Sequence, residues 1–319
     1  MARLFGTDGI RGKANRWPLT APFLLKVGQA AAQVIGDERD ARPQVVIGRD
    51  PRRSGAMLES ALAAGLMSQG VDVKRTGVIP TPGVAYLTRT HQAQLGIVIS
   101  ASHNPFDHNG IKIFGADGFK ISDETEMEIE RLLLDTDDEF EGTDPTRVGR
   151  SDWADDWRQD YVDHLVAGWG DEDAVQGRRV VLDCANGATS EIAPRIFRRL
   201  GFDVVAMENE PDGVNINVNY EYIHPFALRE VVLERDALAG IAFDGDGDRV
   251  MLVDEEGGFV NGDAILAILA RHMKKKGRLT NGAVVSTPMS NWGLKASLEE
   301  VAVRLEETAV GDRFVLQRM

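Results

Sequence analysis

The stretch PQVVIGRDPRRSGAMLESALAAGLMSQGVDVKRTG, residues 43–77, sets out a strand, a polar loop, a helix and a second strand. Its continuous apolar run at residues 45–47 is typical of a strand that is covered on both faces. Residues 54–69 have the pattern of a helix, which Gly70 should terminate before a strand begins at residues 71–73. This order predicts a βαβ unit in a largely parallel sheet.

The same order of elements occurs twice more along the chain. The stretch GRRVVLDCANGATSEIAPRIFRRLGFDVVAM, residues 177–207, predicts a strand at 180–182, a helix at 191–200 and a strand at 203–205. A fainter copy begins at residue 282. Because internal repeats indicate repeated structural units, we predict an α/β protein with three consecutive similar βαβ-type domains and mixed, mostly parallel sheets.

Composition places the boundaries between these domains. The stretch LDTDDEFEGTDPTRVGR, residues 134–150, is acidic and contains glycine and proline, which favours a linker. We therefore expect domain 1 at residues 1–148, domain 2 at 149–255 and an incomplete domain 3 at 256–319. A helix predicted at residues 263–275 should open the third domain.

An aromatic helix is predicted to follow the linker. The stretch SDWADDWRQDYVDHLVAGW, residues 151–169, has the pattern of an amphipathic helix that starts at a Ser-Asp cap. Trp153, Trp157 and Tyr161 recur at helical spacing, so we expect them to pack in a core or between domains rather than to stack on a ligand.

The overall composition is that of a globular protein with more than one core. The 319 residues are 43% hydrophobic and 27% charged, and this length suggests two or more domains. The formal net charge of −14 argues against non-specific nucleic-acid binding. An anionic substrate remains compatible with it, because a local basic cleft can lie on an acidic protein.

The lack of a recognisable signal peptide or membrane span and the single cysteine favour a cytoplasmic protein. The N-terminal residues lack the apolar stretch of a signal peptide, and no run approaches the roughly 18 apolar residues that a membrane span needs. Cys184 is the single cysteine, so no intramolecular disulfide can form. We expect Cys184 to be a small buried residue at the end of a strand.

The clearest sign of chemistry is AFDGDGDRVMLV, residues 242–253, in which Asp244, Asp246 and Asp248 alternate with two glycines. The glycines allow the backbone to bend so that the three carboxylates converge. Clustered carboxylates repel one another and need a cation, and ligands that are all oxygen favour Mg²⁺. Arg249 adds a positive group beside the site, as phosphate chemistry often requires.

Two other interpretations of this stretch are open. The spacing resembles the start of an EF-hand loop, and Glu255 falls at its twelfth position, but Arg249 stands where that loop needs glycine. The residues that follow Arg249 also predict a strand. The other interpretation is a solvated acidic turn, which the regular pattern and the close flanking strands disfavour.

The second stretch of interest is GIVISASHNPFDHNGIKIFG, residues 96–115, in which a buried strand ends in a polar turn. Ser102 beside His103 resembles a hydrolase nucleophile with its base, but no G-x-S-x-G elbow surrounds it. Asn104 and Pro105 favour a sharp turn that presents Ser102 outward. Alone, this segment is compatible with an ordinary polar turn.

Together with a magnesium site, Ser102 has the features of a serine that carries a phosphoryl group. The oxygens of a phosphoserine can complete the coordination of the metal. Lys112 follows in the stretch NGIKIF and is a candidate for an acid/base or a phosphate clamp. The alternative for Lys112 is an exposed lysine on a strand.

Several arginines lie near these stretches. The segment FGTDGIRG, residues 5–12, is not a Walker loop, but Arg11 between its glycines is well placed to reach a phosphate. For Arg49, Arg52 and Arg53 we expect structural salt bridges rather than contact with a substrate.

These motifs together resemble those of the α-D-phosphohexomutases. The resemblance runs through the whole chain and rests on five segments in the order and spacing of that family: LFGTDGIRG (4–12), GIVISASHNPFDHNGIKIFG (96–115), FDGDGDR (243–249), VNGD (260–263) and VGDRFVLQRM (310–319). The form FGTDGIRG is similar to that of the phosphoglucosamine branch, whereas the phosphomannomutase/phosphoglucomutase relatives carry a YDIRG form.

The resemblance implies roles for individual residues. Ser102 corresponds to the phosphoserine of the family, and its phosphate would be a ligand of one Mg²⁺ ion per chain. The other implied Mg²⁺ ligands are Asp244, Asp246 and Asp248, and the implied catalytic residues around them are Arg11, His103, Lys112 and Arg249.

The implied reaction is that of an isomerase, an intramolecular phosphotransferase that interconverts glucosamine 6-phosphate and glucosamine 1-phosphate. The phosphoserine donates its phosphoryl group to the sugar, giving a 1,6-bisphosphate, and then takes back the other phosphate. Glucose or glucosamine 1,6-bisphosphate would act as activator, and the product would feed amino-sugar and cell-wall synthesis. The resemblance further implies a phosphosugar partner, a homodimer, and neither nucleic acid nor membrane.

The sequence departs from the family in two places. The stretch NINVNYEYIHP, residues 215–225, replaces an N-x-x-C-G-S-T-H-P-like run, and the mismatch falls at residues 220–223. The chain also ends at Met319, before a sugar-binding G-E-x-S-G-H loop and a fourth domain, so we expect a fragment or a shortened relative. The alternatives are a non-catalytic phosphohexomutase-like module, a phosphomannomutase/phosphoglucomutase and an unrelated Mg²⁺-dependent phosphatase.

Overall fold

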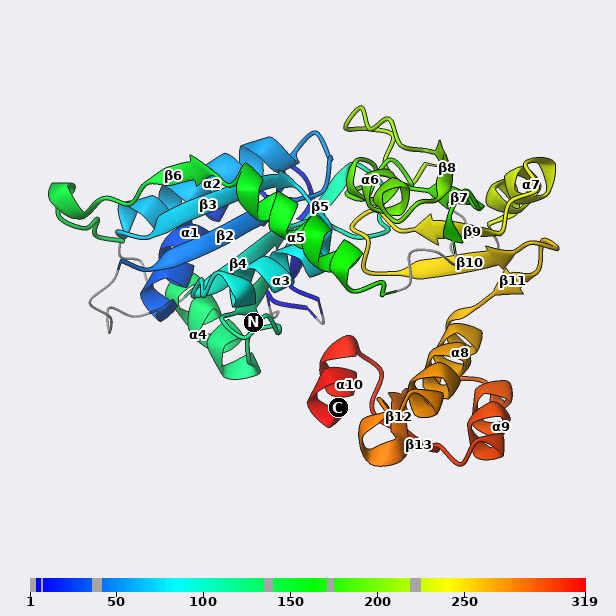
Figure 1. Cartoon of the computed structure of the whole chain (residues 1–319). Coiled ribbons are helices and arrows are strands. Elements are labelled where there is room, and N and C mark those ends of the chain that lie inside the picture. The colour runs from blue at the N-terminus through cyan, green and yellow to red at the C-terminus, as the bar shows by residue number, and fades with distance from the viewer. Residues whose placement is uncertain (1–3, 7, 36–41, 135–139, 171–174, 219–224) are drawn as a thin grey trace.

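The computed structural model presents three successive α/β units, two built on large sheets and a third that is small (Figure 1). The repeated strand–helix–strand order predicted this arrangement, and its sheets are mixed, as expected. The structure describes residues 4–6, 8–35, 42–134, 140–170, 175–218 and 225–319.

The first unit is built on a sheet of six strands. Their order is β1 (Ile10–Lys13), β5 (His108–Gly115), β4 (Leu95–Ile99), β2 (Gln44–Arg49), β3 (Asp72–Val78) and β6 (Ser151–Trp153). The pairs among β4, β2, β3 and β6 are parallel, whereas β5 and β1 add on antiparallel at one edge.

Helices cover both faces of this sheet. They are α1 (Ala21–Ile35), α2 (Gly55–Ser68), α3 (Thr81–Thr90) and α4 (Asp123–Leu134), with a short 3₁₀ helix at Pro145–Arg147. Val45 and Ile47 of β2 pack with α1 and α2, whereas Val46 faces the core that contains α3, which is the alternation expected of a doubly covered strand. Helices α1 and α2 cross closely at Gly28 and Gly65, where a Cβ on Gly65 would lie 2.0 Å from the carbonyl oxygen of Leu25.

The second unit repeats the design with a sheet of five strands. Their order is β11 (Phe259–Val260), β10 (Val250–Asp254), β9 (Ala239–Phe243), β7 (Arg179–Asp183) and β8 (Asp203–Met207). Strand β7 pairs in parallel with β8 and β9, and β9 and β10 form an antiparallel hairpin. Helices α6 (Ile192–Arg199) and α7 (Phe226–Glu234) pack against the sheet. The turn of the β9–β10 hairpin contains the three predicted aspartates.

Helix α5 (Asp155–Ala167) joins the first two units. It contacts α3 on one side and α6 on the other, and one hydrophobic core contains buried residues from all three helices. His91 stacks on Trp157 with ring centroids 3.8 Å apart, and Tyr161 is buried. The predicted packing roles of Trp157 and Tyr161 are therefore confirmed, and the shared core fixes the two units against each other.

The helix predicted at residues 151–169 begins later than expected, so its predicted start is wrong. Residues 151–153 form strand β6, which extends the first sheet in parallel beside β3, and the helix begins only at Asp155 without a side-chain cap. Trp153 is consequently not on the helix: it is 59% exposed and lies under the guanidinium of Arg75. The first sheet therefore extends past the boundary predicted at residue 148.

The third unit contains a parallel pair of strands, β12 (Ala283–Ser286) and β13 (Arg304–Glu307). Around them lie α8 (Gly262–Lys275), a 3₁₀ helix (Thr280–Gly282), α9 (Trp292–Glu300) and α10 (Asp312–Arg318). Its small core consists of Ala270, Leu294, Leu298 and Val303. Within the described part of the chain, no helix is both long and apolar enough to span a bilayer.

Candidate active site

The site lies where the loop after β4 meets the turn of the β9–β10 hairpin. Ser102 follows β4, and its Oγ donates a hydrogen bond to Oδ2 of Asp244 at 2.6 Å. The loop from the first unit therefore touches the aspartate turn of the second unit. Two motifs that are 142 positions apart in the sequence therefore lie together.

Ser102 is not presented outward, contrary to the prediction from the polar turn. It is 1% exposed, because the aspartate turn and Asn217 of the second unit cover the loop. Its backbone has a left-handed φ of 52°. The side chain of His103 lies beside it, with Nδ1 3.3 Å from the Oγ of Ser102.

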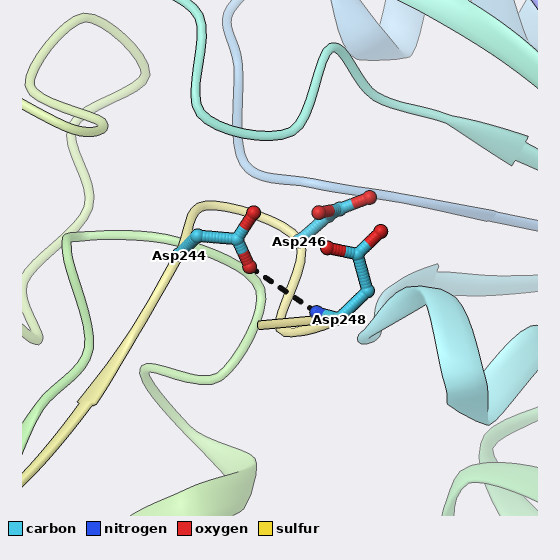
Figure 2. Close-up of side chains that lie close together, drawn as sticks. All are labelled: Asp244, Asp246 and Asp248. Atoms are coloured by element: carbon cyan, nitrogen blue, oxygen red, sulfur yellow. Dashed lines mark hydrogen bonds between the residues drawn. The ribbon is translucent and has the colours of Figure 1, made fainter. Parts of the chain in front are cut away.

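The three aspartates converge, as Figure 2 shows. One carboxylate oxygen from each lies within 4.8 Å of the others, and the backbone amides of Asp248 and Arg249 donate to Oδ1 of Asp244, each at 3.2 Å. Asp244 and Asp246 are buried, so the solvated acidic turn is excluded for them. The strand β10 that follows at Val250 excludes the EF-hand loop.

The electrostatics of the cluster fit a cation. Burial, together with the charges of Asp246 and Asp248, raises the pKa of Asp244 to about 7. Oδ1 of Asp246 is buried and accepts no hydrogen bond from any residue that the structure describes. A buried carboxylate oxygen without a donor and a set of repelling carboxylates are both stabilised by a hard cation. The residues present therefore fit a divalent metal ion.

Lys112 on β5 is buried beside the cluster, so the interpretation as an exposed strand lysine is wrong. Its side chain is 2% exposed, and Nζ lies 2.8 Å from Oδ2 of Asp246 and 3.0 Å from Oδ2 of Asp248. Burial alone would lower the pKa of Lys112, but these carboxylates and Asp8 raise it above its ordinary value. The neighbouring carboxylates thus favour the charged ammonium of Lys112, which suits a charge-stabilising role.

Asp8 is a site residue that the sequence reasoning missed, although it lies inside the FGTDGIRG motif. It forms ion pairs with Arg11, with Lys112 at 3.4 Å and with Lys120 at 2.6 Å. Burial would raise the pKa of Asp8, but these cations hold it below its usual range. Asp8 therefore links the N-terminal motif to the cluster.

Thr81 at the start of α3 was also missed. Its Oγ1 donates to Oδ2 of Asp246 at 2.6 Å, and its backbone amide donates to the carbonyl of Asp246 at 2.9 Å. No local sequence pattern marks this threonine, because the contact joins residues 165 positions apart. It fixes the orientation of the Asp246 carboxylate.

Arg249 and His103 form the more exposed side of the site. A guanidinium nitrogen of Arg249 lies 3.2 Å from Nδ1 of His103. Burial and the neighbouring charges of Arg249 and Arg11 lower the pKa of His103, which favours the neutral imidazole. All five predicted catalytic residues and the three aspartates therefore lie in one connected region.

The arginines of residues 49–53 have the structural role that the sequence predicted for two of the three. Arg49 pairs with Glu59 at 3.0 Å, and Arg52 pairs with Asp50 at 2.8 Å, both pairs with buried carboxylates. Arg53 contributes a backbone hydrogen bond to the carbonyl of Gly213.

The divergent residues 220–223 lie outside the described residues.

Comparison with family models places three consecutive domains on the chain. The phosphoglucomutase/phosphomannomutase α/β/α domain I matches residues 2–139, domain II matches 159–258 and domain III matches 261–319.

Among curated relatives, the chain is similar to the phosphoglucosamine mutases of Bdellovibrio bacteriovorus and Syntrophus aciditrophicus. Each is 48% identical to this chain. The match with the Bdellovibrio protein covers 99% of this chain and 70% of that protein. The match with the Syntrophus protein covers 100% of this chain and 71% of that protein. Among solved structures, a phosphoglucomutase/phosphomannomutase family protein from Burkholderia thailandensis superposes with a TM-score of 0.83 at 26% identity, covering 99% of this chain and 68% of its own. A phosphomannomutase-like protein from Thermus thermophilus gives a TM-score of 0.82 at 28% identity, covering 97% and 70%.

Proposed function

The chain belongs to the phosphoglucomutase/phosphomannomutase family, the α-D-phosphohexomutases, and we propose that it interconverts glucosamine 6-phosphate and glucosamine 1-phosphate. It is an isomerase that acts by intramolecular phosphoryl transfer. The phosphoglucosamine mutases at 48% identity support the choice of sugar. The observation that carries the chemistry is Ser102 Oγ, held 2.6 Å from Asp244 at a cluster of three carboxylates.

Ser102 carries the phosphoryl group in this proposal. Asp244, Asp246 and Asp248 would hold one Mg²⁺ ion, and the Ser102 phosphate would supply a further oxygen ligand. The ion would supply charge stabilisation to the phosphoryl group during transfer. Support comes from the buried Oδ1 of Asp246, which has no donor among the described residues, and from the raised pKa of Asp244, since a cation would stabilise both carboxylates.

The cations of this chain stabilise negative charge around the phosphoryl group. Lys112 is fixed by its contacts with Asp246 and Asp248, so it provides a positive charge that needs no rearrangement. Arg11, Arg249 and His103 surround the more open side, where they bind and orient a phosphosugar. Phosphoryl transfer depends mainly on such positioning and electrostatics.

The reaction proceeds in two transfers. The phosphoryl group leaves Ser102 Oγ for the free hydroxyl of the sugar monophosphate, which gives a 1,6-bisphosphate and an unmodified serine. After the bisphosphate reorients in the site, Ser102 takes the other phosphoryl group, and the isomeric monophosphate is released. Glucose or glucosamine 1,6-bisphosphate therefore loads the serine and activates the enzyme.

Phosphopeptide mapping tests this function. The chain is incubated with glucosamine 1,6-bisphosphate and Mg²⁺, beside the variants Ser102→Ala and Asp246→Ala. We expect phosphate on Ser102 of the unchanged chain and in neither variant. A chain that stays unmodified at Ser102, or that releases free phosphate as a phosphatase does, contradicts the proposal.

The remaining expectations stay predictions. They are a homodimer and a cytoplasmic location. The relative rates with glucosamine, glucose and mannose phosphates distinguish the proposed substrate from those of a phosphomannomutase/phosphoglucomutase.

A further inference from the structure

The loop that carries Ser102 has its backbone carbonyls turned towards the side chain of Arg52. The Nη2 of Arg52 donates to the carbonyl oxygens of Ser102 and Asn104, at 2.9 and 2.8 Å. Its Nη1 donates to those of His108, at 3.0 Å, and Pro105. One guanidinium, with a side chain that is completely buried, therefore binds four carbonyls of residues 102–108.

Arg52 is itself held by groups that lead back to Ser102. Its Nε pairs with Oδ2 of Asp50 at 2.8 Å, and Ser100 Oγ donates to the same oxygen at 2.6 Å. The backbone amide of Ser102 donates in turn to Ser100 Oγ at 2.9 Å. The amide and the carbonyl of Ser102 are thus both fixed by one connected buried network, which a simple structural salt bridge would not require.

Asn217 reaches the same carbonyls from the second unit. Its Nδ2 donates to the carbonyl oxygen of Ser102 at 2.9 Å and to that of Asn104 at 3.1 Å. Arg52 and Asn217, which we call the carbonyl clamp, therefore hold the loop from two units at once. Ser102 has a left-handed φ of 52°, a conformation that a non-glycine residue keeps only when its surroundings impose it.

We propose that Arg52 and Asn217 are positioning residues that hold the Oγ of Ser102 at the three aspartates during phosphoryl transfer. Arg52 is buried below the loop, and both side chains donate to backbone carbonyls of residues 102–108, so they would act through that backbone. The inference rests on the proposed function. Because a misplacement of about 1 Å can cost about 100-fold in rate, loss of the carbonyl clamp should reduce the transfer rate far more than substrate binding.

The variants Arg52→Lys and Asn217→Gly test this role. Lysine keeps the charge opposite Asp50 but cannot reach four carbonyls with one planar group. Glycine keeps the left-handed backbone of Asn217, whose φ is 59°, while it removes the amide. Arg49→Lys is the matched control for the first, because Arg49 pairs with the buried Glu59 and its hydrogen bonds go to Glu59 and to the carbonyl of Asp50 rather than to residues 102–108.

Asn281→Gly is the matched control for Asn217→Gly, because Asn281 has the same φ of 59° in the third unit. The first measurement is the rate of Ser102 phosphorylation by glucosamine 1,6-bisphosphate at saturation. We expect a fall of about 100-fold for Arg52→Lys and about 10-fold for Asn217→Gly, with KM within about two-fold of the unchanged chain and both controls within about three-fold.

The second measurement is hydrogen exchange of the amides in residues 102–108, which needs no activity. We expect faster exchange in Arg52→Lys and Asn217→Gly than in either control. Transfer rates that fall no further than those of the controls, or exchange that stays unchanged, overturn the inference. If the unchanged chain is not phosphorylated at Ser102, the proposed function fails, while the exchange data still decide whether the carbonyl clamp orders the loop.

Discussion

Replacing Lys112 by methionine should destabilise the fold strongly when no divalent ion is present. Lys112 lies 2.8 Å from Asp246 and 3.0 Å from Asp248, with its own side chain only 2% exposed. Removing one partner of a buried ion pair leaves uncompensated charge and costs about 3–5 kcal/mol. The upper part of this range is expected, because Asp8 also loses a partner.

A divalent ion should offset part of this loss. In the unchanged chain, the positive charge of Lys112 beside Asp246 and Asp248 repels Mg²⁺, so its removal should tighten Mg²⁺ binding. An ion at about 100 times its dissociation constant adds about 2.7 kcal/mol to the free energy of unfolding. The increase on adding Mg²⁺ should therefore be larger in Lys112→Met than in the unchanged chain.

Urea denaturation with EDTA and with saturating Mg²⁺ measures both effects. Lys74→Met is the matched control, because Lys74 pairs with the exposed Asp152 at 3.0 Å, and such a pair contributes about 1 kcal/mol or less. If Lys112→Met costs no more than Lys74→Met in EDTA, or if Mg²⁺ stabilises both chains equally, the account of the cluster as a cation site that Lys112 neutralises is refuted.

Three further predictions concern other parts of the molecule. Burial raises the pKa of Asp183 from 3.8 to about 6, so the folded state holds its proton longer than the unfolded chain. The contribution of Asp183 to the free energy of unfolding should therefore fall by about 3 kcal/mol as pH rises from about 4 to 6. Urea titrations at several pH values should show a smaller fall in Asp183→Asn, and an unchanged dependence on pH contradicts the assignment. Gly65→Ala places a Cβ 2.0 Å from the Leu25 carbonyl oxygen and should lower stability by about 1–3 kcal/mol in the same assay, where a neutral result would mean that α1 and α2 do not cross this closely. Thr81→Val removes the hydrogen bond to Asp246 and should weaken Mg²⁺ binding several-fold by calorimetric titration, whereas Thr81→Ser retains it; equal affinity in both variants would exclude this orienting role.

Local sequence patterns predicted the elements that depend on local periodicity. The strand, helix and strand of residues 43–77 appear as β2, α2 and β3, and Gly70 ends the helix with a φ of 86°. The convergence of the three aspartates also followed from their spacing alone, since one short turn contains all of them.

Features that depend on contacts between distant segments were not predictable in this way. Lys112 has the sequence context of any strand lysine, and only the packing of β5 against the aspartate turn buries it. Ser102 was expected outside because its turn is polar, yet Arg52 and Asn217 supply partners for that polarity in the interior. Strand β6 forms because its backbone pairs with the edge strand β3, although its residues have a helical pattern in the sequence.

Phosphorus NMR of the chain with glucosamine 6-phosphate, Mg²⁺ and a trace of glucosamine 1,6-bisphosphate tests the central claim most directly. The account predicts that the signal of glucosamine 1-phosphate grows while total phosphate ester is conserved, and that Ser102→Ala abolishes the conversion. Growth of free phosphate, or conversion that survives in Ser102→Ala, would contradict it.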